Sequence, residues 1–120
     1  MKIELNEDQA LKVIKNYYKE VEGTDINACF KRDEVEKDLN VTLMSYSYVE
    51  FAGMNFKVEE EIDNNKIEEI VNYYLSADYN FKELSFGLYK EYYRPDDYAE
   101  RVKMVIEFEP VIQKTKQRLR

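Results

Sequence analysis

The chain contains no histidine, no tryptophan and one cysteine, Cys29, among its 120 residues. Without an imidazole, neither a Ser-His-Asp triad nor a Cys-His pair can form, and a histidine-containing zinc site is excluded. A single thiol builds neither a disulfide framework nor a four-thiolate metal site. The glycines Gly23, Gly53 and Gly87 lie too far apart for a phosphate-binding loop or a dinucleotide fingerprint. We therefore expect no enzyme activity, no cofactor and no metal.

Long apolar runs are also missing. No stretch approaches the ~20 apolar residues that cross a bilayer, and the opening segment 1–8 lacks the apolar core of a signal peptide. The lone thiol fits a reducing compartment. We therefore expect a cytoplasmic protein in a bacterial host cell, with no membrane partner.

The chain length and the charge define one acidic domain with a short basic end. A chain of 120 residues with three glycines and two prolines has room for one domain and little linker. We place this domain at 1–113. The tail 114–120 carries four positive charges and no acid, so the net charge of −7 leaves the domain more acidic still. Such a domain repels nucleic acid and is attracted to basic surfaces, which argues against direct nucleic-acid binding.

Apolar periodicity predicts an α+β fold. Stripes at helical spacing predict helices near 7–21 and 64–76, and period-two alternation predicts the strands. The segment Leu11–Tyr18 aligns with Ile67–Tyr74 at an offset of 56, and both copies end in Asn-Tyr-Tyr. We interpret this as a duplicated α-β-β unit, with pseudo-repeats near 1–62 and 63–113. Its two helices are expected on one face of an antiparallel sheet.

Acidic clusters are the first group of candidate binding residues. Glu59, Glu60, Glu61 and Asp63 form one cluster, and Asp96 and Asp97 belong to the other. Paired carboxylates can serve catalysis or metal binding. However, consecutive acids on a strand point to opposite faces, so we interpret these clusters as solvated or partner-binding surface.

Tyrosine is unusually frequent, with eleven residues. Tyr92, Tyr93 and Arg94 fall in an expected loop, and tyrosine and arginine are enriched at binding hot spots. These rings could instead cover a sheet edge. Met44, Tyr46 and Tyr48 form a second aromatic stripe on the long strand, either exposed or facing the helices.

The opening segment 1–11, with Tyr17-Tyr18-Lys19-Glu20 and the second-copy segment 72–76, resembles small phage and prophage proteins of Firmicutes. The resemblance covers mainly the two helices and carries no functional residues. It implies an anti-defence role of the anti-CRISPR type, in which an acidic domain occupies the positively charged channel of an RNA-guided nuclease.

The function expected from the sequence is therefore a non-catalytic acidic binding protein, an inhibitor of a host protein with a basic surface. One alternative is a small-molecule binder that sequesters a nucleotide signal, for which Arg94, Arg101 and Lys103 would supply cationic groups. The other is a structural or assembly protein that acts as a homodimer or larger homo-oligomer.

Overall fold

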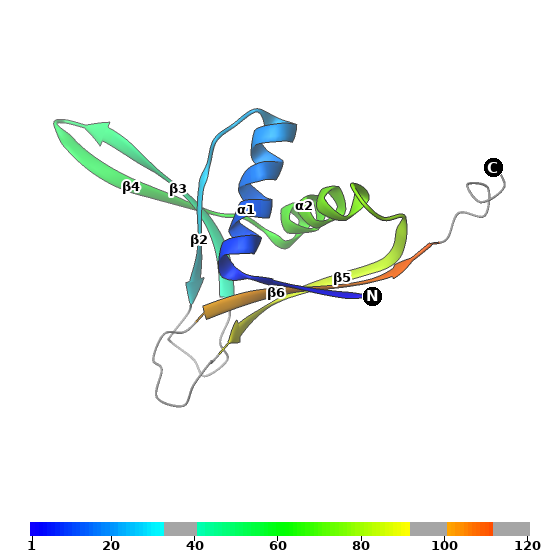
Figure 1. Ribbon diagram of the computed structural model, residues 1–120. Helices are drawn as coiled ribbons and strands as arrows, with labels where there is room; N and C mark the ends of the chain where they lie inside the picture. The colour runs from blue at the N-terminus through cyan, green and yellow to red at the C-terminus, as the bar shows by residue number, and fades with distance from the viewer. Residues whose placement is uncertain (33–40, 92–100, 112–120) are drawn as a thin grey trace.

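The computed structural model describes residues 1–32, 41–91 and 101–111, and confirms the α+β class (Figure 1). Its elements in chain order are β1 (Lys2–Asn6), α1 (Glu7–Tyr17), the π-helical turn η1 (Tyr18–Glu22), β2 (Asn27–Arg32), β3 (Val41–Phe51), β4 (Met54–Glu61), α2 (Asn64–Ser76), β5 (Phe81–Glu91) and β6 (Arg101–Pro110).

Both helices begin at a polar capping residue. The Asn6 side chain accepts the backbone N–H of Gln9 at 2.9 Å, and the Gln9 side chain accepts the backbone N–H of Asn6 in return. Asp63 caps α2 by accepting the backbone N–H of Lys66 at 2.8 Å. Gly23 ends η1 at a φ of 65°, in the left-handed region that glycine adopts without strain. These local signals are why the helix positions could be predicted.

The strands form two three-stranded antiparallel sheets, with orders β1-β6-β5 and β2-β3-β4, where the sequence suggested one sheet. The additional strand is β1, which the apolar pattern did not predict. It is short and carries charged residues, and its partner β6 lies at the far end of the chain. Figure 1 shows both helices above the sheet of β1, β6 and β5.

The element order strand-helix-strand-strand occurs twice, as β1-α1-β2-β3 and as β4-α2-β5-β6. The first strand of each unit pairs with the last strand of the other unit, so that β1 joins β6 and β4 joins β3. The two helix caps, Asn6 and Asp63, are 57 positions apart. The buried residues directly before them, Leu5 and Ile62, are also 57 positions apart. In the structure the two units are therefore offset by 57 residues, one more than the Asn-Tyr-Tyr match indicated. The first unit ends and the second begins at the turn after β3.

One hydrophobic core joins the helices to both sheets. Ile14 of α1, Ile67 and Leu75 of α2, Leu43 of β3 and Ile106 of β6 are each at most 1% exposed. Leu43 also accepts the backbone N–H of Ile62 at 2.9 Å, where β4 leads into α2. The helices therefore cover β3 near this residue, and the far end of the strand extends beyond them (Figure 1).

Candidate functional site

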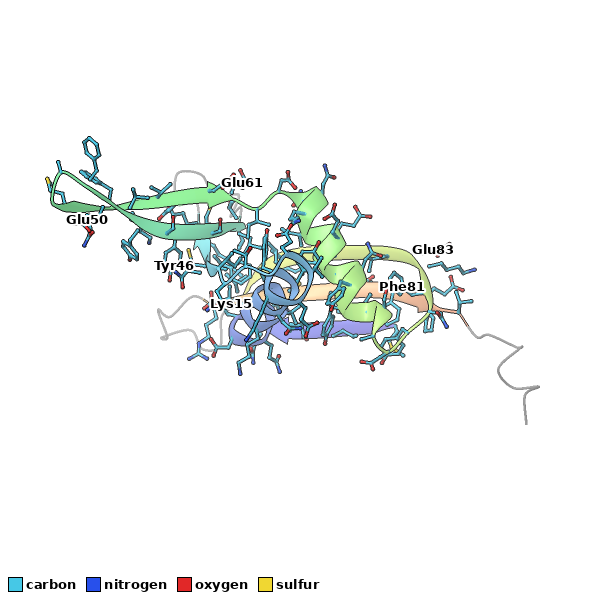
Figure 2. All side chains as sticks on the ribbon, turned by 90° about the horizontal axis from the view of Figure 1, so that it is seen from above. Lys15, Tyr46, Glu50, Glu61, Phe81 and Glu83 are labelled. Carbon is cyan, nitrogen blue, oxygen red and sulfur yellow. The ribbon has the colours of Figure 1, made fainter. Side chains whose placement is uncertain are left out.

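A β-hairpin arm projects from the body of the molecule. We define the arm as residues 47–58, the distal parts of β3 and β4. β2 pairs with β3 only as far as Asn27 opposite Tyr46, so the arm has two strands where the base of the sheet has three. Figure 2 shows Glu50 near the outer end of the arm, far from Phe81 at the opposite end of the molecule.

The turn of the arm fixes which side chains share a face. Ala52 and Gly53 have φ values of 53° and 76°, as in the two-residue turns that match strand twist. This turn sets Phe51 opposite Met54, Val49 opposite Phe56, and Ser47 opposite Val58. Directly opposite residues point to the same side of a ribbon. One side of the arm is therefore almost wholly apolar.

We call this side the apolar face and define it by five residues, given with their exposed fractions: Val49 (48%), Phe51 (73%), Met54 (60%), Phe56 (46%) and Val58 (48%). Its exposed surface is on the order of 500 Å², in the range of the largest patches on soluble monomers, which are often functional. The same alternation continues along β3 and β4 to the base of the sheet. Leu43 and Ile62 therefore lie on this side as well, and both are buried there. The apolar face is thus an uncovered continuation of a core face.

The opposite side of the arm is polar and is joined by ion pairs to the base of the sheet. Glu59 forms ion pairs with Lys31 and, at 3.3 Å, with Lys57. The hydrogen bond with Lys31, assisted by Lys57, lowers the pKa of Glu59. Lys57 also lies 4.6 Å from the ring centre of Tyr46. Tyr48 is 65% exposed on this side, so the stripe of Met44, Tyr46 and Tyr48 lies opposite the apolar face.

The structure separates the four acids of the first cluster. Glu59 belongs to the ion-paired polar side. Glu60 lies opposite Ser45, on the side of the apolar face, whereas Glu61 lies opposite Met44 and alternates away. The Asp63 carboxylate caps α2. Of these four carboxylates, only that of Glu60 lies on the side of the apolar face and forms no ion pair or hydrogen bond with another described residue.

A cavity of about 420 Å³ adjoins the base of the arm on this side. Three acids of the first cluster, Glu60, Glu61 and Asp63, line it together with Tyr18, Glu22 and Lys66 from the helical layer. Lys66 Nζ binds Glu22 at 2.6 Å, which leaves the carboxylates of Glu60, Glu61 and Asp63 to give the cavity a negative charge. The apolar face therefore ends in an acidic pocket.

The wall of this pocket is held by Lys66. Its ammonium lies 5.2 Å from the ring centre of Tyr17 and 5.5 Å from that of Tyr18, and the hydrogen bond to Glu22 raises its pKa. Burial raises the pKa of Tyr18 as well. This cluster ties α2 to the π-helical turn, and π-helical turns are frequent at functional sites.

The remaining residues expected from the sequence lie outside the described part of the chain: Tyr92, Tyr93, Arg94, Asp96 and Asp97. The basic tail 114–120 lies outside it too. Among the described residues, no group of acids and cysteine is arranged to hold a metal ion, and no helix has the length and apolarity to cross a membrane.

The apolar face was not predicted, although the sequence contained a signal for it. Once Ala52 and Gly53 are taken as the turn, the period-two pattern places all five apolar residues on one side. A scan against protein-family models and searches of curated proteins and solved structures found no match to this chain.

Proposed function

We propose that the protein is a non-catalytic binding protein that receives a basic, amphipathic segment of a partner protein on the arm. The apolar face carries this proposal. An isolated two-stranded ribbon is at best marginally stable in water, and this one exposes five aliphatic and phenylalanine side chains on a single side. Such a surface is typical of a protein-protein contact.

The size of the apolar face sets the expected affinity. Covering ~500 Å² of apolar surface at ~25 cal/mol per Å² contributes about 12 kcal/mol. Association costs at least about 4 kcal/mol in lost motion. The difference is at most about 8 kcal/mol, which makes the micromolar range the tightest binding expected from this face alone.

Charge identifies the chemistry of the partner. The arm contains one acid, Glu50, and one base, Lys57, so its own charge is zero. The pocket at its base presents Glu60, Glu61 and Asp63. A segment with an apolar stripe and lysine or arginine at one end therefore complements the whole surface. Near Leu43, α1 and α2 cover the same side of the sheet. We therefore expect the partner segment to be a helix as well, packed on the arm in the same way.

A second copy of the chain fits this surface less well. Two copies each carry a net charge of −7 and repel one another. The basic partner avoids the repulsion and adds the contact with the acidic pocket.

An RNA-guided nuclease belongs to the proposed class of partner, because it holds nucleic acid in a positively charged channel. The support for this specific partner is the acidity of the chain and of the pocket beside the arm. The matching assay is target cleavage by such a nuclease in the presence of the protein. We expect inhibition that Val49→Asp abolishes, and full activity at saturating protein would contradict this partner.

The general proposal is tested with a labelled amphipathic helical peptide that carries an apolar stripe and a lysine-rich end. Fluorescence anisotropy is expected to show micromolar binding, and a peptide of equal apolarity with a glutamate-rich end is expected to bind at least tenfold more weakly. Raising the salt concentration should weaken only the contribution of the basic end. Equal binding of the two peptides would contradict the charge argument.

Two pairs of variants locate the contact. Val49→Asp on the apolar face should abolish peptide binding, whereas Tyr48→Asp on the opposite side should preserve it. Glu60→Gln should weaken binding, whereas Glu50→Gln, with the same loss of charge on the polar side of the arm, should not. Light scattering provides the last control, since a dimer that Val49→Asp dissociates would make a second copy the occupant.

A further inference from the structure

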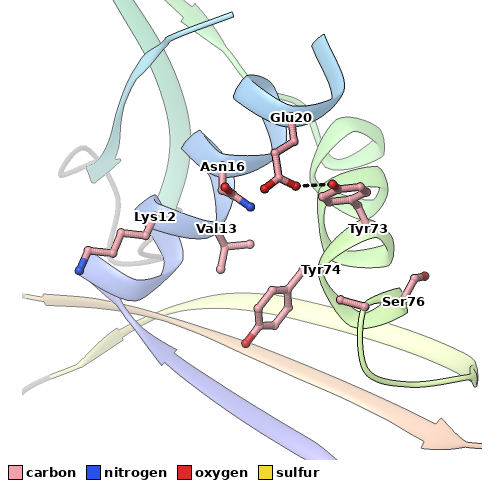
Figure 3. Close-up of a pocket in the computed structure, with 8 residues that line it drawn as sticks. Lys12, Val13, Asn16, Glu20, Tyr73, Tyr74 and Ser76 are labelled. Carbon is pink, nitrogen blue, oxygen red and sulfur yellow. Dashed lines mark hydrogen bonds between the residues drawn. The ribbon is translucent and has the colours of Figure 1, made fainter. Parts of the chain in front are cut away.

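A second hollow lies between the two helices, away from the arm, with a volume of about 590 Å³ (Figure 3). Eight residues line it: Lys12, Val13, Asn16, Glu20, Tyr73, Tyr74, Ser76 and Ala77. Its volume is within the ~300–1,000 Å³ that small-molecule sites occupy, and the space between packed helices is a common place for such sites.

Apolar and aromatic side chains form one half of the lining of this hollow, and polar or charged side chains form the other half. Figure 3 shows Val13 of α1 and Tyr74 of α2 both projecting into the space between the two helices, which Ala77 also lines. The Tyr73 hydroxyl donates a short hydrogen bond to the Glu20 carboxylate and so joins η1 to α2. This bond raises the pKa of Tyr73. The interior thus suits an apolar body of small-molecule size.

Unpaired positive charge lies beside the hollow. Lys12, Lys15 and Lys19 line an adjoining hollow of about 460 Å³, which shares Lys12 and Asn16 with the first. Asp25 is the one acid among the residues that line this second hollow. No described carboxylate pairs with the three lysines, whereas every other lysine in the described ranges takes part in an ion pair or another interaction.

We infer that the hollow between α1 and α2 binds a small amphipathic organic anion. Its apolar body lies against Val13 and Tyr74, and its carboxylate, sulfonate or phosphate-monoester group is bound by Lys12 and Lys19. Three unpaired lysines side by side repel one another, and an anion relieves this repulsion. The site is separate from the arm and does not depend on the proposed function.

The probe is 1-anilinonaphthalene-8-sulfonate, an aromatic sulfonate whose fluorescence rises in apolar surroundings. Titrations use the Phe56→Asp variant, which removes the apolar face as a competing site. We expect saturable binding of one probe per chain. N-phenyl-1-naphthylamine, which lacks the sulfonate, should bind about tenfold more weakly, as expected for the loss of charge-assisted contacts.

Variants of the hollow complete the test in the same background, with folding checked by circular dichroism. Lys12→Gln with Lys19→Gln should weaken sulfonate binding about tenfold. The matched double variant Lys2→Gln with Lys82→Gln should leave it unchanged. Ala77→Trp, which fills the hollow from an exposed position, should abolish it.

Three results would overturn the inference. The first is absence of probe binding once Phe56→Asp is present, because the arm would then be the site. The second is equal affinity for the sulfonate and for the neutral amine. The third is unchanged binding in Ala77→Trp.

Discussion

Truncation of one phenylalanine on the arm and one in the core should have very different effects on stability. Phe51 is 73% exposed, so about a quarter of its side chain is in contact with the protein. Phe108 of β6 is 3% exposed and packs on Tyr79 and Phe81 at ring-centre distances of 5.0 and 6.0 Å. Phe51→Ala and Phe108→Ala are the same chemical change in these two settings.

The expected magnitudes follow from burial. Removing a buried phenylalanine ring costs about 3–5 kcal/mol, so Phe108→Ala should lower the unfolding free energy by that amount. Scaling the same cost by the quarter of Phe51 in contact gives about 1 kcal/mol for Phe51→Ala. At ~4 °C per kcal/mol for a chain of this size, the melting temperatures should fall by about 12–20 °C and about 4 °C.

Urea unfolding followed by circular dichroism measures both free energies, provided that the dependence on urea is the same in the two variants. If Phe108→Ala does not fold, Phe108→Leu gives a smaller loss on the same scale. Equal losses for Phe51→Ala and the core variant would refute the reasoning, because the apolar face would then stabilise the fold itself and would not need a partner.

Three further predictions concern local features. Asp63→Ala should destabilise the protein by about 1 kcal/mol through loss of the α2 cap, whereas Asp63→Asn should cost a few tenths, and thermal unfolding compares them. Ala52→Asn should stabilise the arm turn, since asparagine tolerates a positive φ better than alanine, and amide exchange in the arm should slow. Tyr73 should ionise above the usual tyrosine pKa, because the neutral hydroxyl donates to Glu20. The stability from that bond is therefore present below about pH 10 and lost as the pH rises through the folded pKa, which ring-carbon NMR on wild type and Tyr73→Phe would test.

The helices were predictable because their signals are local. Asp63 and the apolar stripe after it define α2 within one stretch of sequence, and the structure has the helix at 64–76. The strands after each helix were equally clear from alternation. The sequence also indicated the turn after Phe51 and the strand that returns from it, which form the β3-β4 hairpin. What it did not indicate is the pairing of β1 with β6, because this contact joins distant segments and leaves no periodic trace.

The candidate site was only partly predictable, for a similar reason. The sequence identified Glu60 within an acidic run, but alternation alone does not say which side of a sheet faces the helices. It also indicated strands through Phe51 and Phe56, whose apolar character is typical of a buried face. That these residues lie beyond the reach of α1 and α2 depends on the length of the arm relative to the helices, a property of the assembled fold.

The central claim is that the apolar face is a docking surface for a basic amphipathic segment. Two-dimensional NMR of the protein, titrated with the lysine-ended peptide, tests it most directly. Shifts should concentrate on Val49, Phe51, Met54, Phe56 and Glu60 and leave Tyr48, on the opposite side of the arm, nearly unchanged. Shifts confined to other parts of the molecule, or none at peptide concentrations well above the micromolar range, would contradict the claim.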